Sequence, residues 1–147
     1  MRKFEFKHIV GFEETNLVGN VYYANYVRWQ GRCREMFLSQ HAPEVLADLQ
    51  GDLVMATTRC ACEYLAELTA FDRIVIRMTL GGMVQNRVQM KFEYWQIADD
   101  GERLVARGEQ EIACMRRTDE RTVPTQIPAV LRQALLPYQE TPARRAG

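Results

Sequence analysis

Hydrophobic and polar residues alternate along most of this chain, and a single helical repeat interrupts the alternation. From Lys3 to Val10, Phe4 and Phe6 alternate with Glu5 and Lys7, which predicts a half-buried strand. From about Asn25 to Ser39 the period changes, and the segment is predicted to be an amphipathic helix. Its apolar face comprises Tyr26, Trp29, Gln30, Cys33, Met36 and Phe37, and its solvent face carries Arg28, Arg32 and Glu35.

The second half of the chain returns to a period of two. Four strands are predicted, at Leu53–Leu65, Phe71–Leu80, Asn86–Ile97 and Arg103–Met115. Pro43 and Gly51-Asp52 mark the connection after the helix, Gly81-Gly82 ends the second of these strands, and Asp99-Asp100-Gly101 reads as a hairpin turn. A short terminal helix is expected over Pro128–Tyr138.

One strand, one helix and four further strands predict an antiparallel α+β domain whose helix packs on one face of the sheet. We expect a single domain over residues 1–138 and a disordered tail over residues 139–147.

The charge balance argues against a nucleic-acid-binding protein. Lys plus Arg and Asp plus Glu each total 19, so the 147-residue chain has no net charge, although Arg28, Arg32 and Arg34 lie close together. The N-terminus has no signal-peptide pattern, and no apolar stretch approaches the roughly 20 residues that span a bilayer. We therefore expect a cytoplasmic protein that binds neither nucleic acid nor membrane.

The cysteines and histidines do not suggest a metal or redox centre. The four cysteines (Cys33, Cys60, Cys62 and Cys114) are scattered through predicted core segments, as expected in a reducing compartment. His8 and His41 have no zinc-ligand spacing, and no Gly-x-Ser-x-Gly motif is present. Neither a metal, a cofactor nor a serine- or cysteine-based triad is expected.

The loop that precedes the predicted helix carries the most specific motif. Residues 13–26 resemble the catalytic loop and helix start of hot-dog-fold thioesterases of the 4-hydroxybenzoyl-CoA type, in which Asp-x-x-Gly-x-Val precedes an Asn-Tyr pair. The matching positions are Gly19, Val21, Asn25 and Tyr26, whereas Asn16 occupies the position of the Asp. The resemblance implies a long central helix wrapped by a curved antiparallel sheet.

A more specific resemblance points to the substrate. The run from Val10 to Phe37 is similar to the thioesterases of enediyne polyketide synthases, which also carry Asn at this position, and residues 106–115 give further support. This resemblance implies hydrolysis of a polyene or β-keto acyl chain from an acyl carrier protein, with decarboxylation of the product as a further step. It also implies a homodimer or homotetramer.

The resemblance assigns roles to four residues around the loop. Asn16 would hold the thioester carbonyl or the attacking water, and Gly19 would let the backbone approach the acyl group. The backbone N–H of Tyr23 would stabilise the oxyanion, and the Tyr26 hydroxyl would line the acyl channel. Each residue also has a plain structural interpretation, because Asn and Gly are common in turns and Tyr26 lies on the apolar face.

Arg34 is the fifth candidate, and it lies beside the apolar face of the helix. It matches the arginine of a family pattern Glu-x-x-Arg, in which this chain has Gly31 instead of the acid. Both common family acids are therefore missing, and Glu13 and Glu14 remain as nearby carboxylates, one of which could orient a water. The predicted mechanism is direct attack of water, with Arg34 as a second oxyanion donor.

Two other functions remain open at this point. One is a general acyl-CoA thioesterase of the same fold, and the other is a non-catalytic hot-dog protein that binds acyl chains. A comparison of acyl-CoA and carrier-bound chains as substrates would distinguish the general acyl-CoA thioesterase from one that acts on a carrier protein. Binding of acyl chains without hydrolysis would indicate the non-catalytic protein.

Overall fold

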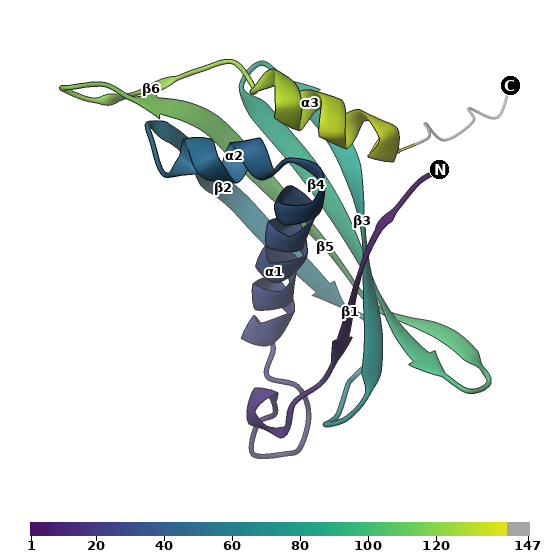
Figure 1. Ribbon diagram of the computed structural model, residues 1–147. Helices are drawn as coiled ribbons and strands as arrows, with labels where there is room; N and C mark the ends of the chain where they lie inside the picture. Colours follow the sequence, from purple (N-terminus) through teal and green to yellow (C-terminus); the bar gives the residue numbers. More distant parts are fainter. Residues whose placement is uncertain (141–147) are drawn as a thin grey trace, which may run out of the picture.

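A curved antiparallel sheet wraps around one long helix in the computed structural model, which describes residues 1–140 (Figure 1). The strands and helices follow one another along the chain in this order: β1 (Phe4–Ile9), a 3₁₀ turn η1 (Phe12–Glu14), α1 (Ala24–His41), α2 (Pro43–Leu49), β2 (Leu53–Tyr64), β3 (Arg73–Val84), β4 (Arg87–Ala98), β5 (Gly101–Arg117), β6 (Thr122–Pro124), α3 (Ala129–Leu135) and a final 3₁₀ turn η2 (Leu136–Tyr138).

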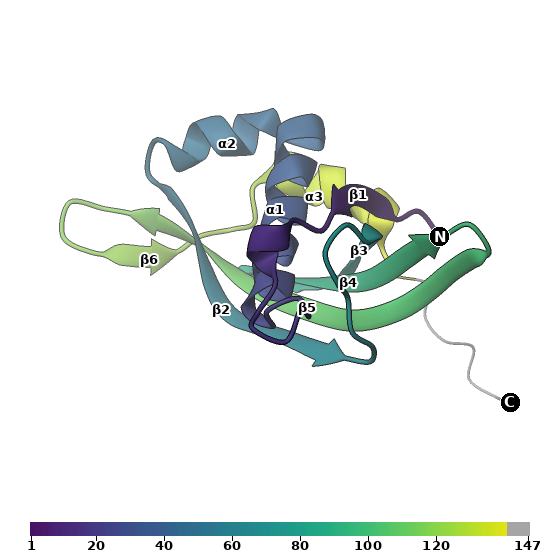
Figure 2. The same cartoon turned by 90° about the horizontal axis from the view of Figure 1, so that it is seen from below.

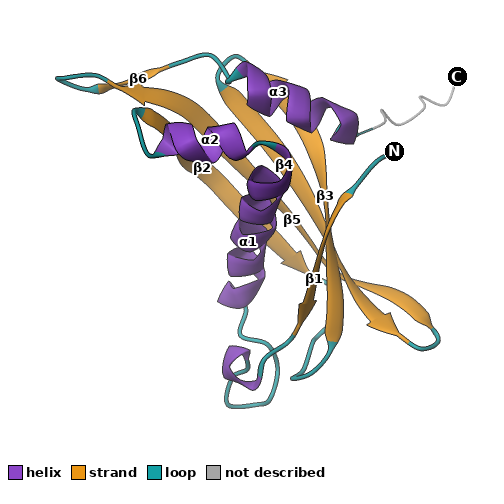
Figure 3. Ribbon diagram, viewed as in Figure 1, coloured by secondary structure: helices purple, strands orange, loops and turns teal. Residues whose placement is uncertain are grey.

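The sheet has the strand order β1-β3-β4-β5-β2, and β6 adds a short pairing to β5. Two hairpins make its centre, because β3 pairs with β4 and β4 pairs with β5, all antiparallel. β1 joins β3 at one edge, and β2 joins β5 at the other. Helix α1 connects these two edges across the hollow of the sheet, as the second view shows (Figure 2). The other helices lie on the same side of the sheet as α1 (Figure 3).

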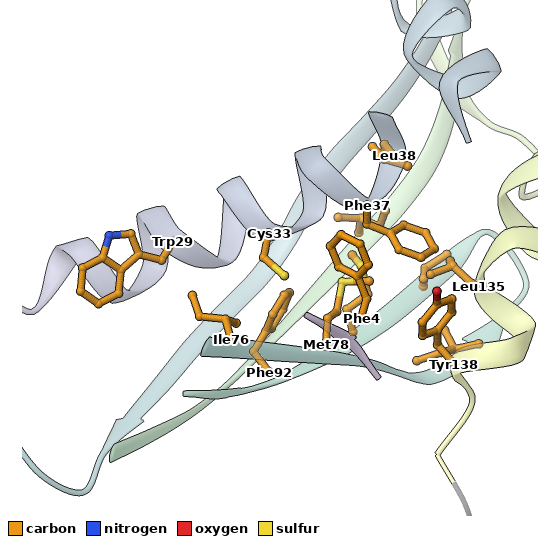
Figure 4. Packing of buried hydrophobic residues seen from close by; sticks show 14 of the residues in the cluster. Phe4, Trp29, Cys33, Phe37, Leu38, Ile76, Met78, Phe92, Leu135 and Tyr138 are labelled. Carbon is orange, nitrogen blue, oxygen red and sulfur yellow. The ribbon is translucent and has the colours of Figure 1, made fainter. Parts of the chain in front are cut away.

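The core lies between α1 and the concave face of the sheet. Trp29, Cys33 and Phe37 of α1 are buried, and Cys33 points toward Ile76 and Phe92 of β3 and β4 (Figure 4). Alternate residues of these strands face the helix, so Ile76 and Phe92 are at most 1% exposed. Phe4 from β1, together with Leu135 and Tyr138 near the C-terminal end, closes this core around Phe37.

The predicted elements are confirmed, with differences at their ends. The helix runs two residues beyond the predicted Ser39, to His41, and every predicted strand is present. Gly81-Gly82 does not end a strand as predicted, because a bulge between Leu80 and Gly82 lets β3 continue to Val84. Pro43 begins the helix α2 rather than a connection, since proline is well suited to the first position of a helix.

The C-terminal prediction falls partly outside the described residues. Gln139 pairs with Leu80 as an isolated bridge, and the Glu140 N–H donates to the Leu80 carbonyl at 3.0 Å. Residues 141–147, which the sequence predicts to be disordered, lie outside the described part. Within residues 1–140, no helix is both long and apolar enough to span a membrane.

Candidate active site

The loop between η1 and α1 is a tight turn that Asn16 holds closed. The Asn16 N–H donates to the Asn20 carbonyl at 2.8 Å, and the Gly19 N–H donates to the Asn16 carbonyl at 3.0 Å. The Asn16 side-chain oxygen accepts from the N–H groups of Val18 and Asn20, at 3.0 and 3.3 Å. Gly19 has φ +89°, a left-handed conformation that glycine adopts without strain.

This geometry limits what the Asn16 side chain can do. Its oxygen is committed to the turn, whereas its amide hydrogens meet no acceptor among residues 1–140. Asn16 is exposed. The NH₂ group of the side chain is therefore available to donate to a bound group. Its oxygen already accepts two hydrogen bonds and is not available to take a proton from a water.

Glu14 fixes the loop to the rest of the domain. Its carboxylate accepts from the Trp29 indole at 2.6 Å and from the Gly11 N–H at 2.8 Å, and it lies 2.7 Å from the His8 ring nitrogen. Its backbone carbonyl accepts from the Asn25 side chain at 2.8 Å. Burial by itself would raise the pKa of Glu14, but the bonds from Gly11, His8 and Trp29 outweigh it, so this pKa is lowered. Glu14 is thus a structural anion rather than a free base.

Helix α1 begins beside this loop with its backbone donors exposed. Tyr23 is the residue that precedes the helix, and no side chain caps its first turn. No acceptor among residues 1–140 meets the Tyr23 N–H, which lies at the positive end of the helix dipole. The Tyr64 hydroxyl, from the end of β2, donates to the Tyr23 carbonyl at 2.9 Å. This helix end can therefore polarise an acyl carbonyl.

Tyr26 is part of an aromatic group behind the helix start. It is 3% exposed, and its ring packs against those of Trp29, Tyr64 and Tyr94, with centroids 4.9 to 5.6 Å apart. The Tyr94 hydroxyl donates to the Tyr26 carbonyl at 2.6 Å. Burial raises the pKa of the Tyr26 hydroxyl to about 12, so this group stays protonated near neutral pH.

Arg34 lies apart from the other candidates. It faces β5, where its guanidinium donates to the buried Gln110 side chain at 3.1 Å, and burial lowers its pKa. Eleven residues separate it from Tyr23, which is about 16 Å along the helix axis. Asn16 and Gly19 thus lie in the loop before α1 and Tyr23 at the start of the helix, whereas Arg34 lies about three turns farther along α1.

A cavity lies on the other face of the sheet. It has a volume of about 570 Å³, and Lys91, Glu93, Arg107 and Glu109 are among its charged lining residues. Because Phe92 faces α1, its neighbours Lys91 and Glu93 point to the convex side. This cavity is therefore separate from the loop and the start of α1.

Comparison with known proteins agrees with this geometry. The model of a family described as the thioesterase-like superfamily matches residues 10–135. The chain belongs to this superfamily. It is a hot-dog-fold thioester hydrolase, as the sequence predicted. A search of curated proteins found no match.

Solved structures give the same fold for this thioesterase. It is 44% identical to the dynemicin thioesterase, with a TM-score of 0.92 over 95% of this chain and 99% of that one. A 4-hydroxybenzoyl-CoA thioesterase, solved with 4-hydroxybenzoyl-CoA, has 16% identity and a TM-score of 0.81, over 92% and 99% of the two chains. A 1,4-dihydroxy-2-naphthoyl-CoA thioesterase from Synechocystis has 18% identity and the same TM-score, over 91% and 96%. The last two show the fold alone.

Sequence reasoning missed three residues that shape the site of this thioesterase. Tyr64 reaches the helix start only because β2 ends beside it, which no local pattern indicates. The turn at η1 brings Glu14 next to His8, and no local pattern indicates this contact either. Gln110 had a usable signal, because it falls in the same alternation as the buried Ile112 and Cys114 of β5.

Proposed function

We propose that this thioesterase releases a polyene or β-keto acyl chain from the acyl carrier protein of an iterative enediyne-type polyketide synthase. The observation that carries the proposal is the 44% identity to the dynemicin thioesterase, whose structures describe polyene binding, over nearly the full length of both chains. The substitution of Asn16 for the family Asp supports it, because it requires a mechanism without a carboxylate at that position.

In the proposed mechanism the thioester carbonyl lies at the start of α1. The Tyr23 N–H and the free amide hydrogens of Asn16 donate to the carbonyl oxygen and stabilise the oxyanion. Water attacks the carbonyl carbon directly, a C–O bond forms, and the C–S bond breaks. The proton of the attacking water leaves to solvent, and the carrier-bound thiolate is the leaving group. No acyl-enzyme forms.

The carboxylates near the loop fit this mechanism. Glu14 accepts from three groups and its pKa is lowered, so it is a poor candidate for a general base. Glu13 is exposed at the surface of the 3₁₀ turn. Since a thioester is an activated acyl group, polarisation and positioning supply the main part of the rate enhancement. A β-keto acid product would then lose carbon dioxide.

Arg34 is proposed to act on the acyl chain. Its distance from Tyr23 along the helix is greater than one side chain spans, so the two groups do not share an oxyanion bound at Tyr23. Its guanidinium has five N–H donors, of which one meets Gln110. The remaining donors can bind a carbonyl oxygen farther along the chain, in surroundings where burial strengthens a charge-assisted hydrogen bond.

A second copy of the chain completes the proposed site. Asn16 is exposed, Leu17 and Val18 are 107% and 79% exposed, and Tyr23 is 62% exposed, which leaves the loop open in one protomer. β2 presents a free edge of twelve residues that ends at Tyr64, beside Tyr23. A long free edge is a surface for strand pairing. Pairing of two such edges would enclose the loop and give a homodimer, and two dimers would give a homotetramer.

The proposal is tested by comparing substrates of matched acyl chain. Polyene chains are loaded on the carrier protein and, separately, on coenzyme A, and thiol release is followed at equal concentration. We expect at least tenfold higher kcat/KM for the carrier-bound chain, a difference of about 1.4 kcal/mol. Preference for coenzyme A would indicate a general acyl-CoA thioesterase. Binding without hydrolysis of either would indicate a non-catalytic acyl-binding protein.

The oligomer is tested separately by sedimentation at several protein concentrations. A monomer at all concentrations would contradict the paired β2 edges. Arg59→Pro places a residue without a backbone N–H at an exposed position within β2. If the edges pair, this variant should sediment as a monomer, and it should also lose its activity.

A further inference from the structure

Gln30 is a fully buried polar side chain in the middle of α1 that uses only half of its hydrogen-bonding capacity. It is 0% exposed, and its carbonyl oxygen Oε1 has no hydrogen-bond partner among the described residues. Such an acceptor is uncommon in a folded core, because it has lost its water and gained nothing in exchange. It therefore indicates a place where a donor from outside the chain binds.

The orientation of the Gln30 amide is fixed by its neighbours. Its nitrogen Nε2 donates to the Ala61 carbonyl at 3.0 Å, and a carbonyl can only accept, so Oε1 must point the other way. The Tyr94 hydroxyl hydrogen is already donated to the Tyr26 carbonyl at 2.6 Å. No hydrogen on either neighbour remains for Oε1.

The sheet is shaped to hold this amide. Gly108 of β5 faces Gln30, and a Cβ at this position would lie 2.0 Å from Nε2 and 3.1 Å from the Ala61 carbonyl oxygen. Any side chain at 108 would therefore displace the Gln30 amide from its place against β2 and β5. The amide is thus held by a glycine and a strand carbonyl, with one acceptor left over.

Gln30 lies on a polar strip inside the domain. Residues at intervals of four share a helix face, so Tyr26, Gln30 and Arg34 lie in one row along α1. Arg34 bonds to Gln110, two residues beyond Gly108 on β5, so amide and guanidinium groups continue along the contact between helix and strand. Gln30, the second residue of the row, lies about 10 Å from Tyr23 along the helix axis, at about 1.5 Å per residue.

The end of β2 lies beside the proposed reaction centre. The Tyr64 hydroxyl bonds to the Tyr23 carbonyl and joins the end of β2 to the start of α1. Tyr64 and Tyr23 are 45% and 62% exposed, so this junction lies at the surface of the protomer. With the carbonyl at Tyr23, the end of β2 is the point at which an acyl chain would have to pass to reach Gln30 along α1.

We propose that Gln30 is a specificity-determining residue, whose free Oε1 accepts a hydrogen bond from a hydroxyl group on the acyl chain. The inference rests on the proposed function, because it takes the thioester carbonyl to lie at Tyr23. Bonds of about 1.5 Å that meet at about 111° advance an extended chain by about 1.25 Å each, so a rise of about 10 Å corresponds to roughly eight bonds. The structure thus assigns a preference for a chain that carries a hydroxyl near its eighth carbon.

The selectivity follows from the unmatched acceptor. A site built to bond a hydroxyl discriminates against a chain without one, because the buried polar group is then left unpaired. Arg34 and Gln30 are complementary in this respect, since the guanidinium offers donors and Oε1 offers an acceptor. We expect wild-type kcat/KM to be about tenfold higher for the hydroxylated chain than for the unsubstituted chain, which corresponds to about 1.4 kcal/mol.

The test uses a series of saturated sixteen-carbon thioesters that differ only in the position of one hydroxyl. For the wild type, the ratio of kcat/KM to that of the unsubstituted chain should peak near the eighth carbon. In Gln30→Leu and Gln30→Met this peak should disappear, because neither side chain has an acceptor. Gln40→Leu is the matched control, an exposed glutamine on the same helix, and it should keep the peak.

A flat wild-type series would overturn the proposal, and so would a peak that survives in the folded Gln30 variants. Failure of both variants to fold would leave the wild-type series as the deciding measurement. Binding of the corresponding thioether analogues, followed by tryptophan fluorescence, gives the same comparison without hydrolysis. A protein that hydrolyses no thioester would therefore refute the proposed function, while the Gln30 preference is still decided by binding.

Discussion

Replacing Glu14 by Gln tests whether this residue fixes the loop to the domain. The Glu14 carboxylate accepts on one oxygen from Gly11 and His8, and on the other from Trp29. An amide has one acceptor oxygen and one NH₂ group. In either orientation, the NH₂ group of Gln faces at least one N–H donor, and the bonds that remain lose the charge of the carboxylate.

The magnitude follows from these bonds. The Glu14 side chain is 14% exposed and that of His8 is 28% exposed, so water compensates only in part. Hydrogen bonds to charged groups contribute about 1.5–3 kcal/mol each, and an unpaired buried donor is penalised by a similar amount. We expect Glu14→Gln to lower the free energy of unfolding by about 2–4 kcal/mol.

Urea unfolding at one fixed protein concentration, followed by tryptophan fluorescence and circular dichroism, measures this loss. Glu13→Gln is the control, because Glu13 is exposed and its replacement should change stability by less than about 0.5 kcal/mol. Equal stability of the two variants would refute the role given to Glu14.

The role of Glu14 also predicts how the free energy of unfolding depends on pH. The pKa of Glu14 is lowered in the folded protein, so its stabilisation is present above the unfolded pKa and is lost as the pH falls through the lower folded value. The difference in unfolding free energy between wild type and Glu14→Gln should therefore shrink below about pH 4.3, the ordinary value for glutamate. A difference that grows on acidification would contradict this sign.

Three further substitutions follow from the site. Asn16→Asp keeps an acceptor for the turn but loses the amide donors, so the loop should stay folded while kcat falls about 10²-fold, as measured with carrier-bound thioesters. Arg34→Ala should lower kcat/KM about 10²-fold by losing a buried charged donor, whereas Arg32→Ala, 61% exposed, should match wild type in the same assay. Gly108→Ala should lower the free energy of unfolding, measured with urea, by about 1–3 kcal/mol, because the added Cβ meets the Gln30 amide. Gly31→Ala is the contrasting variant and should stabilise α1, because nothing lies within 4 Å of a Cβ at that position.

Most of the fold could be predicted from periodicity, because each element buries one face. A period of 3.6 placed Phe37 on the apolar face of the helix, and a period of two predicted the strand that contains Phe92; both side chains are buried in the structure. α2 was missed because its seven residues are too few to show a helical repeat, and Pro43 was interpreted as a breaker. The extension of β3 past Gly81 depends on a bulge, which is set by pairing with β4 and not by local sequence.

The site was predictable only where its residues are close in sequence. Asn16, Gly19 and Tyr23 lie within eight residues of one another, so a single motif was enough to propose them as candidates. The distance between Arg34 and Tyr23 follows from helix geometry, yet the family pattern led us to group both at one oxyanion. Contacts between distant segments, such as that of Gln30 with Gly108, require the register of β2 and β5 over the helix, and sequence alone does not give it.

The pH dependence of kcat/KM for a carrier-bound polyene tests the central claim, that this thioesterase releases its acyl chain without a carboxylate base. We predict measurable hydrolysis whose rate keeps rising with pH as hydroxide becomes available, without levelling off between about pH 5 and 7, where a tuned carboxylate base would titrate. A bell-shaped profile whose acidic limb disappears in Glu13→Gln, or the absence of hydrolysis at every pH, would contradict the account.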